Sequence, residues 1–200
     1  MVEKQEKCLA LMKEILKEKF LDLAMVSYEL REDFDASDAR IVCRVRDVRT
    51  GETQAIEGHG VGIIDAFFHA LKARLAGRYK SLDTIRFSGF TVKGKMDTGR
   101  APASSDALAE VTLGIRNSYG RDFAFTHASR SVTRSGLEAT LSAAEYFVNS
   151  EVAFLAIHDA LRDARAKRRE DMVTTYTAML AVLVENTSYS DVLEARQKEL

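Results

Sequence analysis

The feature that most limits the fold of this sequence is an alternation of apolar and polar residues that occurs in two places. Between residues 40 and 48, Ile41, Cys43 and Val45 alternate with arginines, and residues 109–116 show the same pattern. Successive side chains of a strand point to opposite faces of a sheet. Each segment therefore predicts a strand with one buried and one solvated face.

The residues around the first of these strands predict a unit of three strands and one helix. A turn at 49–51 and a second alternating segment at 53–57 follow it, and residues 21–30 can form a strand before it. From residue 63 the apolar positions take the spacing of an amphipathic helix. Gly77 stands where that helix is expected to stop.

The same order occurs again in the second half of the chain. Residues 84–93 predict a strand with a bulge at Ser88-Gly89, where the alternation slips by one residue. After the second alternating segment, residues 123–125 mark a third strand. A capping-box motif that starts at Ser135 then predicts the beginning of a helix.

The two halves also agree in the spacing of their turns. The turn glycines Gly51 and Gly120 are 69 residues apart, and Gly62 and Ser135, at the predicted helix starts, are 73 apart. We interpret the halves as two strand-strand-strand-helix (βββα) repeats. The sequence thus predicts an α+β fold with three parts: an N-terminal helix at 1–20, the repeat domain at 21–150 and a C-terminal helical extension at 151–200.

The charged residues of the C-terminal half are expected to face solvent. Glu138, Glu145 and Glu151 have no neighbouring histidine or aspartate partners in the sequence and are interpreted as one solvated helix face. The basic run at 162–171 is interpreted in the same way, because no aromatic residues interrupt it. The apolar stripe at 172–183 is expected to pack on the core or on a dimer partner.

Composition argues against several classes of function. The chain is 46% hydrophobic and 30% charged with a formal net charge of -1, which predicts a soluble globular protein that binds neither nucleic acid nor a membrane. Its first twenty residues fit neither a signal peptide nor a spanning helix, so a cytoplasmic location is expected. Cys8 and Cys43 are expected to be reduced thiols. The sequence contains no nucleophile triad or phosphate-binding loop, and His59 and His69 stand ten residues apart, so neither catalysis nor a cofactor is expected.

Three short segments, in the same order, resemble the regulatory domain of 2-isopropylmalate synthases and citramalate synthases. Residues 60–71 read Gly-Val-Gly-Ile-Ile-Asp-Ala-Phe-Phe-His-Ala-Leu and resemble the family's Gly-Asn-Gly-Pro-(Val/Ile)-Asp-Ala-Leu-x-x-Ala-Leu. Residues 105–111, Ser-Asp-Ala-Leu-Ala-Glu-Val, look like Thr-Asp-Ala-Gln-Ala-Glu-Val, and residues 138–141, Glu-Ala-Thr-Leu, look like Glu-Ala-Ser-(Leu/Ala). Asn149 matches the asparagine that usually ends the second helix of that family. The resemblance covers residues 21–149.

The resemblance implies two βββα units related by a pseudo-twofold axis and a homodimer formed through them. It also implies allosteric binding of an end-product amino acid of leucine or isoleucine biosynthesis. The effector-binding residues that it implies are Gly62, Ile64, Phe87, Thr91, Ala107 and Ala109. The catalytic barrel of the synthases needs about 250 residues and has no place in this chain, so a stand-alone, non-catalytic protein is expected.

Four residues depart from the family at the positions that matter for the effector. Val61 replaces an asparagine, Ile63 a proline, Phe87 a tyrosine and Thr91 an alanine. We therefore hypothesise a homodimeric sensor for a small branched-chain amino acid or keto acid. The alternative is a structural dimerisation module that has lost its effector and binds a protein partner through its helical arms.

Overall fold

Two three-stranded antiparallel sheets, with helices packed on them, make up the protein. The computed structural model describes residues 2–95 and 107–184. The first sheet contains β1 (Leu23–Asp33), β2 (Asp38–Asp47) and β3 (Thr53–Gly60), and the second contains β4 (Arg86–Lys95), β5 (Leu108–Arg116) and β6 (Asp122–Ser129). The helices are α1 (Val2–Leu16), α2 (Ile63–Leu75), α3 (Ser81–Thr84), α4 (Val132–Ala166) and α5 (Glu170–Val184), and the 3-10 helix η1 (Lys17–Lys19) follows α1. The α+β class predicted from the sequence is confirmed.

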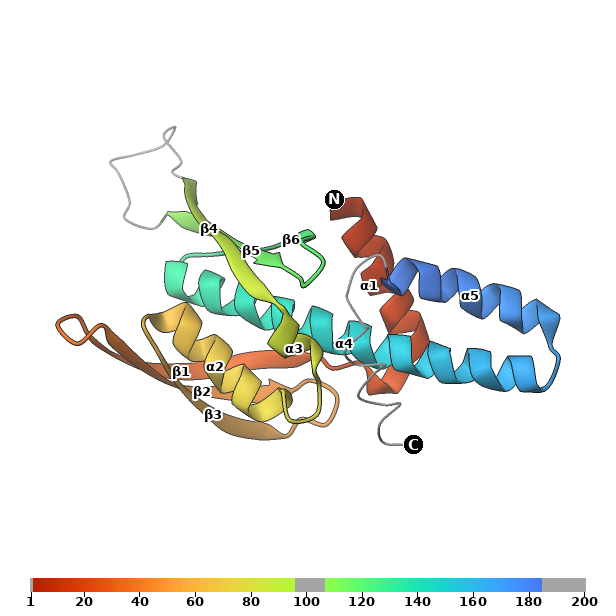
Figure 1. Cartoon of the computed structure of the whole chain (residues 1–200). Coiled ribbons are helices and arrows are strands. Elements are labelled where there is room, and N and C mark those ends of the chain that lie inside the picture. The colour runs from red at the N-terminus through yellow and green to blue at the C-terminus, as the bar shows by residue number, and fades with distance from the viewer. Residues whose placement is uncertain (1, 96–106, 185–200) are drawn as a thin grey trace.

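The helices α2 and α4 form a layer between the two sheets (Figure 1). α2 packs on β2 and β3, α4 packs on β5 and β6, and the two helices contact each other. The side chains that β2 and β5 turn toward this layer are buried, as the alternation predicted. They are Ile41, Cys43 and Val45 on β2, and Val111, Leu113 and Ile115 on β5.

The first strand of each sheet contains a bulge near its start. The register with the neighbouring strand shifts between Met25 and Ser27 in β1, and between Phe87 and Gly89 in β4. The bulge predicted at Ser88-Gly89 is therefore confirmed. The shift brings Phe90 onto the same face of β4 as Phe87, because directly paired residues of neighbouring strands share a face.

The turns and helix starts of the two halves keep a constant spacing. Gly51 and Gly120 both have φ of 73°, a conformation that favours glycine, and each closes the turn between the second and third strands of its sheet. The N-cap residues of α2 and α4 are Gly62 and Ser131, which are also 69 residues apart. The strand order and these spacings thus run in parallel through both halves.

The start of α4 differs from the prediction. Ser131, four residues before the predicted capping box, is the N-cap, and its hydroxyl accepts a hydrogen bond from the Arg134 amide at 3.2 Å. Ser135 is a buried residue inside the first turns, where its hydroxyl donates to the Ala109 carbonyl at 3.0 Å. An earlier serine offers the same cap, so the helix begins one turn sooner.

α4 also continues far past Asn149, where the resemblance implied an end. The side chain of Asn149 accepts a hydrogen bond from the Leu21 amide at 2.7 Å and donates one to the Leu21 carbonyl at 2.8 Å. Since the asparagine is fully bonded to a distant segment, it does not compete with the helix backbone. The helix runs for 35 residues, and the boundary expected between residues 150 and 151 falls inside it.

The prediction of one solvated glutamate face on α4 is wrong. Glu151 is only 3% exposed and accepts hydrogen bonds from the amides of Ser81 at 2.7 Å and Lys80 at 3.2 Å. Glu145 is also partly buried and accepts one from the Leu23 amide. Each carboxylate therefore joins α4 to a segment that is distant in the sequence, and spacing within the helix gives no sign of such partners.

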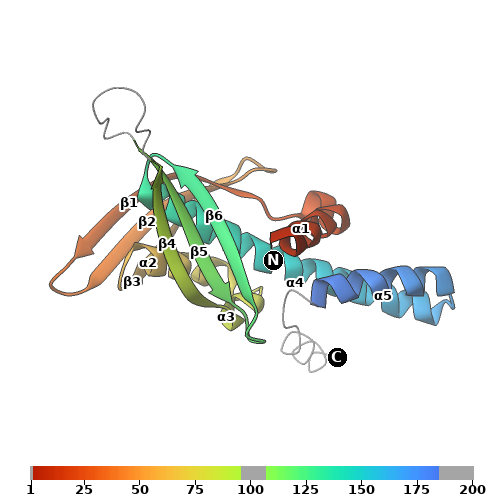
Figure 2. The same ribbon diagram turned by 90° about the horizontal axis from the view of Figure 1, so that it is seen from above.

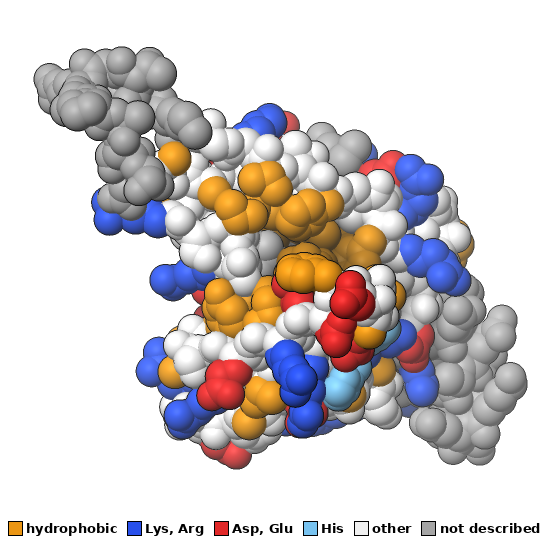
Figure 3. Space-filling model, turned by 90° about the vertical axis from the view of Figure 1, so that its left-hand side faces the viewer, with side chains coloured by type: hydrophobic (Ala, Val, Ile, Leu, Met, Phe, Trp, Pro, Cys, Tyr) orange, Lys and Arg blue, Asp and Glu red, His pale blue; other side chains and the backbone are white. Residues whose placement is uncertain are grey.

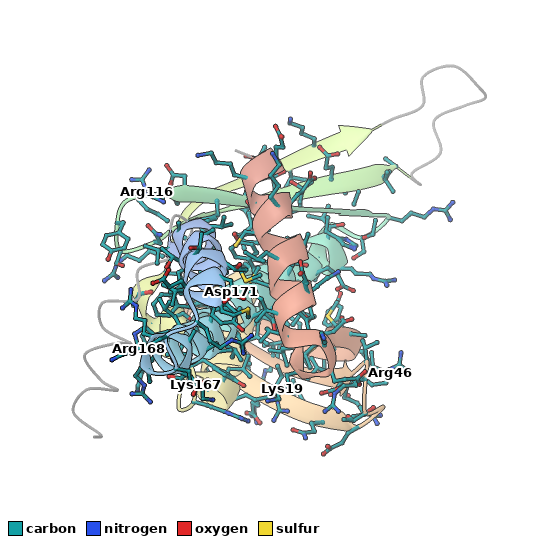
Figure 4. All side chains as sticks on the ribbon, turned by 90° about the vertical axis from the view of Figure 1, so that its right-hand side faces the viewer. Lys19, Arg46, Arg116, Lys167, Arg168 and Asp171 are labelled. Carbon is teal, nitrogen blue, oxygen red and sulfur yellow. The ribbon has the colours of Figure 1, made fainter. Side chains whose placement is uncertain are left out.

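The C-terminal half of α4 and α5 form a helical arm that extends beyond the second sheet (Figure 2). α5 packs back along α4, and Leu183 is fully buried. Lys167 and Arg168 lie at the turn between these helices and are exposed, as predicted for the basic run (Figure 4).

In the described part of the chain, no helix has both the length and the apolar surface needed to cross a bilayer. The part of the predicted C-terminal helical extension beyond residue 184 lies outside the described residues.

Candidate functional site

The glycines before α2 have separate structural roles. A Cβ atom at Gly58 would lie 2.0 Å from the Ala66 carbonyl oxygen, and one at Gly60 would lie 2.5 Å from the Ala66 nitrogen. These two glycines therefore allow α2 to pack directly on β3. Gly62, in contrast, has an extended backbone with φ of -171°, and a Cβ atom there would meet no atom within 4 Å.

The first turn of α2 combines backbone amides with apolar side chains. The amides at a helix start have no carbonyl partner within the helix and carry partial positive charge. The Val61 amide, just before the helix, donates to the Asp65 carboxylate at 3.1 Å, so this amide already has an anionic partner. Ile63 and Ile64 belong to the same first turn, where backbone amides have no carbonyl partner within the helix.

Three elements meet at Gly136 of α4. A Cβ atom at this position would lie 2.9 Å from Cδ1 of Ile64 and 3.7 Å from the nearest ring atom of Phe90. Gly136 is buried, and its lack of a side chain lets α2 and β4 approach α4 closely. Neither this glycine nor Phe90 was predicted to belong to a site, because a glycine in a helical segment gives no sign of which distant residues approach it.

The inner face of β4 is only partly covered by these helices. Phe87 packs edge-on against Phe68 of α2, with ring centroids 4.9 Å apart, and remains 38% exposed. Phe90 and Val92 pair with Leu113 and Val111, so they lie on the same inner face, yet they are 50% and 44% exposed. Phe90 and Val92 are therefore less covered than Phe87.

We call this open apolar region the β4 cleft and define it by Ile64, Phe87, Phe90, Val92 and Gly136. It opens on the side of the molecule shown in Figure 3, where hydrophobic side chains gather around the hollow between the two sheets. An apolar wall beside helix-start amides is the combination that suits a small molecule with one charged and one apolar end.

The structure brings some of the six predicted effector residues together and separates others. Ile64 and Phe87 belong to the β4 cleft, and Gly62 caps the helix beside it. Ala109 lies on the inner face of β5 and is 7% exposed. Thr91 pairs with Thr112 on the opposite face of the sheet, because its neighbours Phe90 and Val92 point inward. Ala107 is partly buried just before β5.

Metal ligands and nucleophiles are the other groups from which a functional site could be built. Within residues 2–95 and 107–184, no three or more His, Cys, Asp or Glu side chains form a cluster that could hold a metal ion. Both cysteines are free and buried. Burial, with a smaller contribution from the Glu138 charge, raises the pKa of the Cys43 thiol to about 11, so this thiol stays protonated at neutral pH.

The sequence matches no family model and no curated protein. The resemblance to the regulatory domain of 2-isopropylmalate synthases therefore stays a prediction that depends on the three segments quoted above. Any function has to be argued from the site itself.

Proposed function

We propose that this protein is a non-catalytic homodimeric regulator, in which the β4 cleft of each chain holds a small branched-chain amino acid or keto acid. The observation that carries this proposal is the uncovered inner face of β4 beside the first turn of α2. The proposal includes the resemblance to the allosteric domain of 2-isopropylmalate synthases, with the two βββα halves as repeats related by a pseudo-twofold axis.

The parallel spacing of the two halves supports the proposed repeat. Paired turn glycines and paired N-caps are each 69 residues apart, and both first strands contain a bulge. A pseudo-twofold axis relates equivalent elements of two such halves. A dimer built on the same elements places a second copy against their open sides.

A second copy is the partner that the exposed side chains favour. Phe90 and Val92 lie on an edge strand and are about half exposed. Full burial of one such side chain is worth about 1.5–3 kcal/mol, so a partner that covers both gains a substantial part of that free energy. Exposed apolar patches of this kind mark interaction sites.

The charge at the start of α2 supports an acid as the ligand. The free amides of Ile63 and Ile64 and the helix dipole stabilise a carboxylate by about 0.3–1 kcal/mol or more where water is excluded. Ile64, Phe87 and Phe90 then offer an apolar wall for a branched side chain. Closure by the second copy supplies the exclusion of water.

One observation favours the alternative, a dimerisation module without effector. The ring contact between Phe68 and Phe87 fills the inner end of the β4 cleft, which leaves less volume for a ligand. In that case the same apolar face serves protein contact alone.

Thermal-shift measurements with leucine, isoleucine, valine and their keto acids distinguish the two functions. We expect at least one of these acids to raise the melting temperature of the wild type, since a ligand that binds the folded state stabilises it. The variant Gly136→Ala puts a methyl group 2.9 Å from Ile64 Cδ1 and pushes that side chain into the cleft, so the shift should decrease. Gly77→Ala is the matched control, because its Cβ meets no atom within 4 Å. If none of the six acids stabilises the wild type, the effector proposal is wrong and the dimerisation module is favoured.

A further inference from the structure

A second cavity lies on the other side of the molecule, between α1, β6 and α4. Its volume is about 460 Å³, within the range of small-molecule sites. Figure 4 shows α1 crossing in front of the second sheet and α4 on this side. The apolar part of the wall consists of Leu9 of α1, Phe20, Phe125 of β6 and Tyr146 of α4.

The carboxyl group of Glu145 forms a polar part of the same wall. One of its oxygens accepts a hydrogen bond from the Leu23 amide at 2.5 Å, which fixes the side chain between α4 and β1. Burial, assisted by the charges of Asp22 and Glu138, raises the pKa of Glu145 to about 8, against the lowering effects of the Leu23 amide and Lys13. The carboxyl group therefore keeps its proton at neutral pH until a positive charge comes close.

Carboxyl groups outnumber cations around this cavity. Among the described residues that line it, Glu6, Asp22 and Glu145 carry carboxyl groups and Lys13 is the only basic side chain. Lys13 lies over the ring of Phe20, with Nζ 5.5 Å from the ring centroid, so part of its charge is directed at that ring. The charges of the described wall thus favour a positively charged ligand group over an acid.

We propose that this cavity binds a small primary amine with an apolar body, with its ammonium group on the carboxylate of Glu145 and its body against Leu9, Phe125 and Tyr146. This proposal concerns a site separate from the β4 cleft and does not depend on the function proposed above. Binding is accompanied by ionisation of Glu145: the proton leaves the carboxyl group for solvent, and the ammonium group takes its place as the partner of the carboxylate.

A matched series of ligands tests the charge preference. Calorimetric titration at pH 7 with 3-methylbutylamine, 3-methylbutanol and 3-methylbutanoate varies the head group and keeps the apolar body. We expect the amine to bind at least tenfold more tightly than the alcohol and the acid to bind weakest. Titration of the amine in two buffers of different ionisation enthalpy should also show release of a fraction of a proton per ligand bound.

Variants test the role of Glu145. Glu145→Gln keeps an oxygen for the Leu23 amide, so the fold should persist while amine affinity falls at least tenfold and proton release disappears. Leu9→Trp fills the cavity and should abolish binding of the amine. Glu14→Gln removes one carboxylate from α1 outside the cavity and should change neither property. Equal affinity for all three ligands, no amine binding up to about 10 mM, or an unchanged amine affinity in Glu145→Gln would each overturn the proposal.

Discussion

β1 and β4 are the first strands of their respective sheets. Each contains a bulge at a similar place and pairs with the central strand in a similar register, but the helices cover the two strands to different extents. The inner face of β1 carries Met25, Tyr28 and Leu30, which are partly buried and pack on the core. The inner face of β4 carries Phe87, Phe90 and Val92, which are 38–50% exposed.

α4 is joined to β1 and the segment before it by polar side chains, whereas α2 contacts β4 through a pair of aromatic rings. α4 is 35 residues long, and its Glu145 and Asn149 bond the backbone of Leu23 and Leu21 at the start of β1. α2 is 13 residues long and meets β4 mainly at the contact between Phe68 and Phe87. The polar anchors of α4 therefore hold β1 on the core, while the inner face of β4 stays partly exposed and available to a ligand or a partner.

Removal of the Asn149 side chain should have the largest effect on the difference in stability between β1 and β4. Asn149→Ala leaves the amide and carbonyl of Leu21 without partners in a partly buried position, which should lower the free energy of unfolding by about 2–3 kcal/mol. Denaturant titration measures this cost, and hydrogen exchange should become faster in β1 and stay the same in β4. Ser142→Ala, at an exposed site on the same helix, is the control. A cost below about 0.5 kcal/mol with unchanged exchange in β1 would show that the anchor does not hold the strand.

The second anchor, Glu145, should make stability depend on pH. Its pKa is about 8 in the folded protein and 4.5 in the unfolded chain, so the folded state binds the extra proton between these values. The free energy of unfolding should therefore decrease as pH rises from about 5 to about 8, and then level off.

Glu145→Gln removes that proton and should flatten the profile. We expect the variant and the wild type to have the same free energy of unfolding near pH 5. At pH 9 the free energy of unfolding of the variant should be higher by about 2 kcal/mol, a value reduced because water reaches the cavity. Urea titrations across this pH range, with Glu14→Gln as control, measure the difference. Parallel profiles for wild type and Glu145→Gln would contradict a raised pKa.

Backbone strain at the ends of the two central helices, α2 and α4, should have a smaller effect on stability. α2 ends without a left-handed residue, whereas the turn after α4 holds Arg168 at φ of 53°. Glycine adopts this conformation without strain, so Arg168→Gly should stabilise the protein by about 0.5–1 kcal/mol. Arg169→Gly, which changes the next residue outside the left-handed region, should bring no gain. Thermal unfolding of both variants measures the difference, and equal melting temperatures would rule out strain at Arg168.

Features with a local cause were predictable from the sequence, and features that depend on distant partners were not. The alternation along β2 and β5, the bulge at Ser88-Gly89 and the helix that starts at Ile63 follow from the period of apolar residues. The burial of Glu145 and the length of α4 depend on hydrogen bonds to residues more than 120 positions away.

The candidate site shows the same limit. The resemblance implied Ile64 and Phe87 as effector residues, and both belong to the β4 cleft. It also implied Thr91, which points to the opposite face of the sheet, as the phase of β4 after the predicted bulge already indicated. Phe90 and Gly136 were missed, since only the packing of α2 and β4 on α4 gives them a role.

Sedimentation velocity on a matched pair of β4 variants tests most directly whether a second copy closes the open face of this strand. Val92→Asp puts a charge on the inner face, and Thr91→Asp puts the same charge on the outer face of the same strand. We expect the wild type and Thr91→Asp to sediment as dimers at micromolar concentration and Val92→Asp to sediment as a monomer. A monomeric wild type, or a Val92→Asp variant that remains fully dimeric, would contradict the account.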